Sequence, residues 1–331
     1  MEFLKLISEE FGASGDENLI SDIIAQKAKE CCQKVFKDNM GNLYCFKEGN
    51  GANKKTIMMS CHTDEVGLII SSATDDGFLK FRTVGGIDSS VLLAKRVKIG
   101  KNRVLGVTGI KAVHLSTAED REKRISTADM YIDIGEKTKE DALNKVNIGD
   151  YAVFDTEFEH MGSLIKGKAF DDRLGCYILC ELMKNTYQND VWYCFTVQEE
   201  IGLRGAAVSS RRIKADAAVV VECTTCLDFP SVDKEKTSTN LAKGPAITIV
   251  DGSTYANVEL REALKSAADK FQYKNVAAGG NDAGAIHLNN IKTAAVSIPA
   301  RYIHSPVSVV CPDDVKECLK MLQNFLNTEE L

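Results

Sequence analysis

The stretch from Trp192 to Gly205, WYCFTVQEEIGLRG, constrains the fold most. Residues 192–197 are apolar, aromatic and β-branched with almost no polar alternation, which is typical of a fully buried strand in an α/β sheet. The run stops at Glu199 and Glu200, at the strand end where such sheets bind ligands. Two carboxylates in a poorly hydrated crevice repel each other, so a proton or a cation must lie beside them. The alternative is a capped turn, because acids also suit the N-terminus of the helix expected to follow.

The composition is that of an ordinary globular chain of 331 residues, long enough for two domains. Lys and Arg number 41 against 47 acidic residues, and no basic cluster stands out, which argues against nucleic acid or an anionic membrane as the main partner. No run approaches the ~18 apolar residues of a membrane span, and the N-terminus lacks an apolar signal segment. We therefore expect a cytoplasmic protein, in which the 11 cysteines are reduced thiols.

The pattern of apolar residues is different between residues 67 and 160. This part consists of short β-like runs, such as FLKFRTVGG, RVKIG and YAVFD, separated by glycine and charged residues. Residues 1–66 and 161–331 instead combine buried strands with helical spacing of apolar residues. We expect a discontinuous α/β domain, 1–66 and 161–331, with a small β-rich domain, 67–160, inserted into it. His114 lies in the insertion, and we interpret it as a structural or interface histidine.

Other apolar runs also end in residues that can bind a metal ion. The run TIMMSC leads directly into His62, and Asp64 would point the same way on an extended chain and could orient the imidazole. A lone His-x-Asp motif is weak evidence for a metal site. Asp171 and Asp172 have an alternative explanation too, because acids are favoured at the N-terminus of a helix. The argument rests on the repetition of one pattern, in which strands or their following turns end in His62, Asp171, Glu199–Glu200, Glu222 and His304.

Together these positions match the needs of a two-metal site. Imidazole and carboxylate ligands, one of them bridging, suit a pair of divalent cations and leave room for water. Such a pair lowers the pKa of a shared water and stabilises the oxyanion that forms when water attacks a carbonyl. One carboxylate must stay uncoordinated to carry the proton, and the doubled glutamate supplies both a ligand and a base.

The motifs SCHTDEVG, GKAFDDRLGC, VQEEIGLRGA, GGNDAGAI and IPARYIHSP closely resemble those of the tetrahedral aminopeptidases, which are cytosolic di-metal enzymes. The resemblance runs in order over nearly the whole chain. It implies a zinc-peptidase-like α/β sandwich with a central mixed sheet and an inserted, small β-barrel-like domain. It also implies removal of N-terminal residues from short peptides, with two divalent metal ions per subunit, zinc or cobalt. The family assembles as a hollow homo-oligomer, a tetrahedral dodecamer.

Carried over to this chain, the resemblance assigns a role to each candidate. It implies that Glu199 is the general base, with Asp64 as the partner of His62. It implies the metal ligands His62 and Glu222 on one ion, Glu200 and His304 on the other, and Asp171 bridging both. Many members of the family have aspartate where this chain has Glu222, so the longer side chain puts the metal preference at that position in question.

Three other functions stay open from the residues alone. A metal-dependent deacylase or carboxypeptidase could use the same kind of sheet and site. Paired carboxylates also hydrolyse glycosides, and some relatives of the family have been labelled glucanases, but that reaction needs carboxyl groups ~5–9 Å apart and aromatic platforms. This chain has a single tryptophan, and it lies within an expected buried strand. A non-catalytic shell is disfavoured because every ligand position holds a residue able to bind metal.

Overall fold

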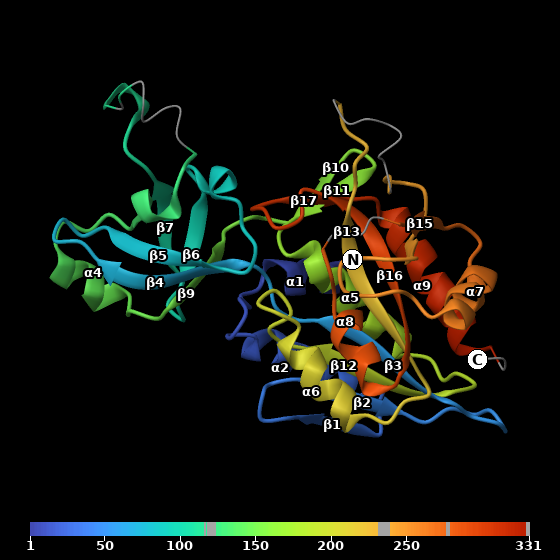
Figure 1. Ribbon diagram of the computed structural model, residues 1–331. Helices are drawn as coiled ribbons and strands as arrows, with labels where there is room; N and C mark the ends of the chain where they lie inside the picture. Colours follow the sequence, from blue (N-terminus) through green and yellow to red (C-terminus); the bar gives the residue numbers. More distant parts are fainter. Residues whose placement is uncertain (116, 118–123, 231–238, 276–278, 329–331) are drawn as a thin grey trace.

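The computed structural model describes residues 1–115, 117, 124–230, 239–275 and 279–328. These residues form two units joined side by side, a large α/β sandwich and a small β barrel (Figure 1). The sandwich takes up both ends of the chain, and the barrel is built from strands between Gly67 and Phe154. The expected α/β sandwich with an inserted barrel is therefore confirmed.

An 11-stranded mixed sheet forms the centre of the sandwich. Its order is β1-β2-β12-β3-β13-β16-β17-β11-β10, with β14 and β15 branching from β16. The middle strands β12, β3, β13 and β16 run parallel to one another. The strands span β1 Lys34–Lys37, β2 Leu43–Lys47, β3 Thr56–His62, β10 Glu159–Met161, β11 Leu164–Gly167, β12 Asp190–Thr196, β13 Ala217–Thr225, β14 Ala246–Thr248, β15 Gln272–Lys274, β16 Lys292–Arg301 and β17 Ser308–Val310.

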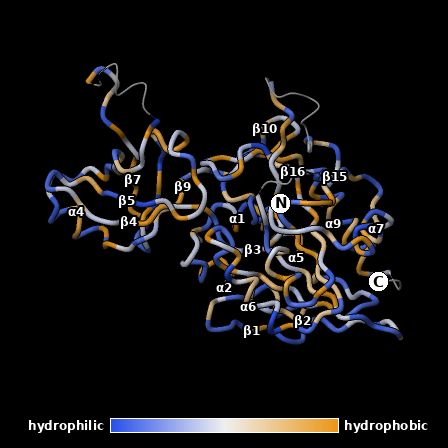
Figure 2. The backbone as a smooth tube through the Cα atoms, viewed as in Figure 1, coloured by the Kyte–Doolittle hydropathy of each residue, from blue (hydrophilic) through white to orange (hydrophobic). Residues whose placement is uncertain are grey.

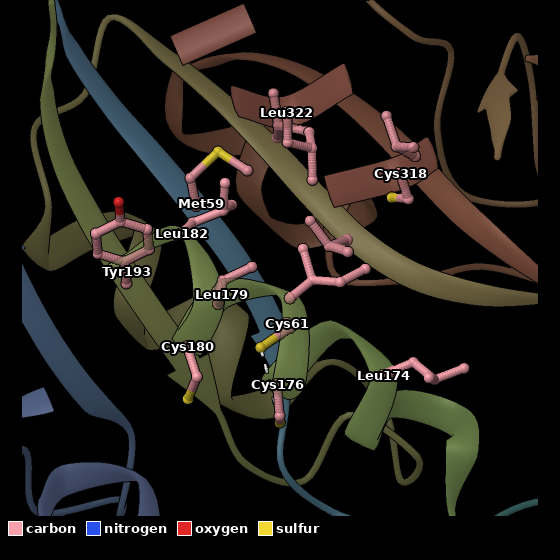
Figure 3. Packing of buried hydrophobic residues seen from close by; sticks show 14 of the residues in the cluster. Met59, Cys61, Leu174, Cys176, Leu179, Cys180, Leu182, Tyr193, Cys318 and Leu322 are labelled. Carbon is pink, nitrogen blue, oxygen red and sulfur yellow. Dashed lines mark hydrogen bonds between the residues drawn. The ribbon is translucent and has the colours of Figure 1, made fainter. Parts of the chain in front are cut away.

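Helices cover both faces of this sheet, which explains why its inner strands are continuously apolar. Along β3, Ile57, Met59 and Cys61 enter the core beneath one set of helices, while Met58 enters the core on the opposite face. Figure 3 shows α5 packed beside β3, and side chains of α5 and α9 help to fill the first core. The helices are α1 Glu2–Glu9, α2 Asn18–Ala28, α5 Phe170–Leu182, α6 Arg204–Arg212, α7 Val258–Ala267, α8 Ala283–Ile286 and α9 Pro312–Leu326.

The smaller unit is a closed barrel of six strands in the order β4-β5-β8-β7-β6-β9. Its interior is a separate apolar cluster that includes Leu68, Phe81, Val97 and Ile132. One short helix, α4 Lys139–Lys145, accompanies the barrel, and Thr138 caps it by accepting the Asp141 amide. The barrel strands are β4 Gly67–Ala73, β5 Leu79–Val84, β6 Arg96–Ile99, β7 Val104–Gly109, β8 Tyr131–Asp133 and β9 Tyr151–Phe154.

Two helices are shorter than their apolar spacing predicts. The spacing predicts a helix from about 19 to 34, but α2 ends at Ala28, and Lys34 already pairs with Phe46 in the β1–β2 hairpin. The spacing also predicts a helix from 255 to 271. There, Asn257 caps the Leu260 amide at 3.1 Å, so α7 begins only at Val258, and the chain is extended again at Ala268. The end of α2 and the start of α7 are therefore set by sheet pairing and by a capping side chain, not by the spacing of apolar residues.

Polar residues predominate in the outer loops of both units (Figure 2). In the parts of the chain that the structure describes, no helix combines the length and apolarity needed to cross a membrane.

Candidate metal centre

The site lies where the parallel strands of the central sheet end. His62 is the last residue of β3, Glu222 lies near the end of β13, and Glu199 and Glu200 follow β12 in a short turn. His304 follows β16 in the same way. Because the carboxyl ends of parallel strands meet at one edge, the sheet gathers residues that are up to 242 positions apart, from His62 to His304.

Asp171 stands between two histidine–carboxylate groups. Its Oδ1 lies 3.3 Å from His62 Nε2, and Glu222 Oε1 lies 3.4 Å from the same nitrogen. Its Oδ2 lies 3.5 Å from His304 Nε2, which is 3.3 Å from Glu200 Oε2. Within each group the ligand atoms all lie within 4.8 Å of one another. The two groups share one aspartate, as two neighbouring metal ions with a bridging carboxylate would require.

The start of α5 separates the roles of two adjacent acids. The backbone of Asp171 and Asp172 is not helical, with ψ angles of 104° and 42°. Asp172 accepts the Gly175 amide at 3.0 Å and the His62 amide at 3.2 Å, so it caps the helix and holds the end of β3. Only Asp171 faces both histidines. The helix-start explanation therefore fits Asp172 and not its neighbour.

Burial and neighbouring charges shift the pKa values of the side chains in both groups. Burial, reinforced by the charge of Asp171, raises the pKa of Glu200 to about 7. Burial likewise raises the pKa of Glu222 to about 8, although His62 partly opposes the shift. Burial alone would lower the pKa of His304, but Asp171 and Glu200 raise it to about 9. Ionised carboxyls buried this close together are costly unless positive charge lies beside them.

Glu199 lies outside both groups. Its Oε2 lies 4.0 Å from His62 Nε2, and it lines the same cavity. Burial raises the pKa of its carboxyl well above the usual range, and Glu222, Asp282 and Glu200 add to the shift. Because this carboxyl lies near the ligand set but not within it, it is free to accept and return a proton.

Asp64 contacts His62, but mostly through its backbone. His62 Nδ1 lies 3.1 Å from the Asp64 carbonyl oxygen and 3.4 Å from its carboxylate. The carboxylate instead accepts the amides of Glu199 and Glu200 at 3.0 and 3.1 Å. Asp64 thus connects the histidine to the turn that bears the two glutamates.

Two acids near the site were given no role by the sequence, although one of them, Asp282, lies in the motif GGNDAGAI. Glu17 lies in the loop before α2, where spacing indicates only a helix cap, yet its carboxylate accepts the Gln198 amide at 3.1 Å. Asp282 lies in the glycine-rich turn before α8 and accepts the Thr196 hydroxyl at 2.5 Å, and burial raises its pKa to about 6. His114 is exposed in the barrel unit and does not line this cavity.

A cavity of about 490 Å³ opens beside the two groups. Lys274, which ends β15, is the one lysine or arginine among the described residues that line it. In the described part of the chain no carboxylate lies within ion-pair distance of its ammonium. The lining is completed by His62, Asp171, Glu199, Glu222, Cys223, Thr224, Thr225, Leu227, Gly279, Gly280, Ile303 and His304.

The helix-covered mixed sheet and its two histidine–carboxylate groups define a metallohydrolase. The family is given by the match of residues 41–321 to the M42 glutamyl aminopeptidase model, and the chain belongs to this family of metal-dependent aminopeptidases. The lysyl aminopeptidase of Pyrococcus furiosus is 29% identical, over 100% of this chain and 97% of its own.

Solved structures agree over the same length. A TET aminopeptidase from Thaumarchaeota archaeon SCGC AB-539-E09 superposes with a TM-score of 0.95 at 32% identity, covering 100% of this chain and 96% of that chain. The TET1 peptidase of Pyrococcus horikoshii, which can assemble into a tetrahedron or a large octahedral shell, has a TM-score of 0.88 at 32% identity, with 98% of both chains covered. A protein from Thermotoga maritima described as an endoglucanase has a TM-score of 0.82 at 31% identity, covering 98% of this chain and 96% of that one.

Proposed function

We propose that this chain is a di-metal aminopeptidase that removes single residues from the free N-termini of short peptides. The observation that carries the proposal is the pair of groups that share Asp171. Imidazole nitrogens and carboxylate oxygens are donors that zinc and cobalt accept, so the residues fit two such ions. His62 and Glu222 would hold one ion, Glu200 and His304 the other, and Asp171 both. Many members of the family have aspartate at the position of Glu222. The extra methylene of glutamate places its carboxylate further from the backbone, which affects which metal ion this position prefers.

Two bound cations would lower the pKa of a water between them and stabilise negative charge on the scissile carbonyl oxygen. Glu199 takes the proton from the water and returns it to the leaving amine. Its place, 4.0 Å from His62 Nε2 and outside the ligand groups, leaves its carboxylate free for this transfer. Asp64 fixes the position of the glutamate turn relative to His62. Its backbone carbonyl oxygen contacts His62 Nδ1, and its carboxylate accepts the Glu199 amide.

The free N-terminus of the substrate is the feature that separates this function from its rivals. A peptide amine can coordinate a metal or pair with the carboxylates of the site, whereas an acetylated one carries no such charge. We expect the purified, metal-loaded protein to cleave an unblocked peptide at least about ten-fold faster than its N-acetylated twin, because an unpaired buried carboxylate costs ~1.4 kcal/mol or more. Mass spectrometry of the products would check this, and cuts within the peptide or equal cleavage of both would contradict it.

A glucan remains the alternative substrate because a structural relative carries that description. The carboxylates of this site surround two histidines and leave no aromatic platform among the residues that line the described cavity. Incubation of the same protein with a β-glucan, before and after chelation of metal, separates the two functions. Release of sugar that survives chelation would favour the glycosidase.

The cavity also predicts a preference for acidic substrates. Lys274 brings a positive charge to a cavity whose acidic lining residues, Asp171, Glu199 and Glu222, would be engaged with the metal ions or the proton transfer. A Glu or Asp side chain at the substrate N-terminus would gain a charge-assisted hydrogen bond there. We expect Lys274→Ala to lower kcat/KM for glutamyl p-nitroanilide by about 10–100-fold. The leucyl substrate, which carries no charge, is the control, and an equal loss on both would contradict the role.

We also propose a homo-oligomer, a tetrahedral dodecamer, on the basis of the similarity to the TET1 peptidase, whose solved structures include a dodecamer and a tetrahedron. In that assembly residues 67–160, taken as the inserted domain, would contribute to subunit contacts and to access to the site.

A further inference from the structure

We propose that Glu17 is a positioning residue, which fixes the catalytic turn by holding the backbone amide that precedes Glu199. The inference rests on the proposed function, because it matters only if Glu199 carries the proton. The N-terminal loop that contains Glu17 lies 181 residues from Gln198 in sequence, so this role has no local origin.

The turn that bears the two glutamates is held by its amides. The amides of Gln198, Glu199 and Glu200 are three consecutive donors, and each donates to a carboxylate. Glu17 Oε1 accepts the first at 3.1 Å, and the two oxygens of Asp64 accept the others at 3.0 and 3.1 Å. The turn is therefore fixed by two side chains from elsewhere in the chain.

Gln198 needs such a restraint more than its neighbours. Its φ angle is +57°, in the left-handed region that residues with a Cβ atom rarely adopt. A residue persists there only when the surroundings fix it. The bond from the Gln198 amide to Glu17 is the side-chain contact that does so, and the next residue along the chain is Glu199.

The loop that provides Glu17 is itself clamped to the strand that ends in His62. Ser14 donates its hydroxyl to Asp64 Oδ2 at 2.6 Å and its amide to the Glu65 carbonyl at 3.3 Å. Glu17 Oε1 also accepts the Gly15 amide at 2.7 Å. These contacts place the loop, the end of β3 and the glutamate turn in one buried network, in which Glu17 is 5% exposed.

A simple capping role does not explain Glu17. It occupies the N-cap position of α2, but its backbone is helical, with φ −86° and ψ 0°, and its side chain makes no capping bond to that helix. The carboxylate points away from α2, to the Gln198 amide. The helix would therefore lose little from its removal, whereas the turn would lose its first restraint.

The test compares Glu17→Ala, Glu17→Gln and the control Asp16→Ala in the full-length, metal-loaded protein. We expect Glu17→Ala to keep two metal ions and the parent KM but to lower kcat by about 10–100-fold, as misplacement of a catalytic group does. Glu17→Gln keeps an oxygen that accepts the Gln198 amide, so it should recover most of kcat. Asp16 is the neighbouring acid, and among the described residues its carboxylate makes no hydrogen bond to the turn, so Asp16→Ala should match the parent.

Hydrogen exchange supplies a readout that does not depend on activity. In metal-free protein, peptides covering residues 197–201 should exchange faster in Glu17→Ala than in the parent, while peptides from β13 should not change. Parent-like kcat and parent-like exchange in Glu17→Ala would overturn the inference, as would equal losses in Glu17→Gln and Glu17→Ala. If the parent itself released no N-terminal residues, the proposed function would fail, and the exchange experiment would still decide whether Glu17 holds the turn.

Discussion

Replacing Glu199 by glutamine will leave both metal ions bound but lower kcat by about 10²–10⁴-fold, the usual contribution of general acid–base catalysis. Glutamine has the same shape, but its amide cannot take a proton from water at neutral pH. The ligand groups exclude Glu199, so metal affinity should not change. Metal analysis and initial rates on an amino-acid p-nitroanilide, measured on the same preparation, check both halves of the prediction.

The matched comparison is Glu200→Gln, one residue further along the same turn. Glu200 Oε2 lies 3.3 Å from His304 Nε2 and belongs to the second ligand group, so its change should reduce metal content at that position. If Glu199→Gln lost metal while Glu200→Gln kept both ions, the roles of the two glutamates would have to be exchanged.

The substitution Asp171→Asn should have the largest effect on metal binding. Each oxygen of Asp171 serves a different group, so an asparagine weakens both metal positions at once. We expect fewer than one ion per chain after dialysis. We also expect activity to fall by about 10³-fold or more, since each ion is worth several kcal/mol of transition-state stabilisation.

A suitable control is Asp313→Asn, because Asp313 is also an acid in the first turn of a helix but is exposed and forms an ion pair with Lys316. Metal content and rate should then stay at the parent level. Two ions retained in Asp171→Asn would contradict the shared position of this carboxylate, while folding of both variants can be followed by circular dichroism.

The class of fold was predictable because its signals are local. Buried strands such as Trp192 to Val197 are recognisable from composition alone, and the short runs between residues 67 and 160 differ visibly from them. The ends of the helices were harder to predict from the sequence. The ends of α2 and α7 depend on sheet pairing and on the Asn257 cap, which compete with apolar spacing.

The residues at the strand ends could be predicted from the sequence, because an apolar run that stops at a charged residue can be recognised without knowing the fold. His62, Glu199 and Glu222 could be named for that reason. The role of each acid depends instead on contacts made in the folded chain. Asp171 and Asp172 are adjacent in sequence, yet one faces two histidines and the other caps a helix. The same holds for Glu17, whose partner Gln198 is 181 residues away, because contacts between distant segments depend on how the sheet brings its strand ends together.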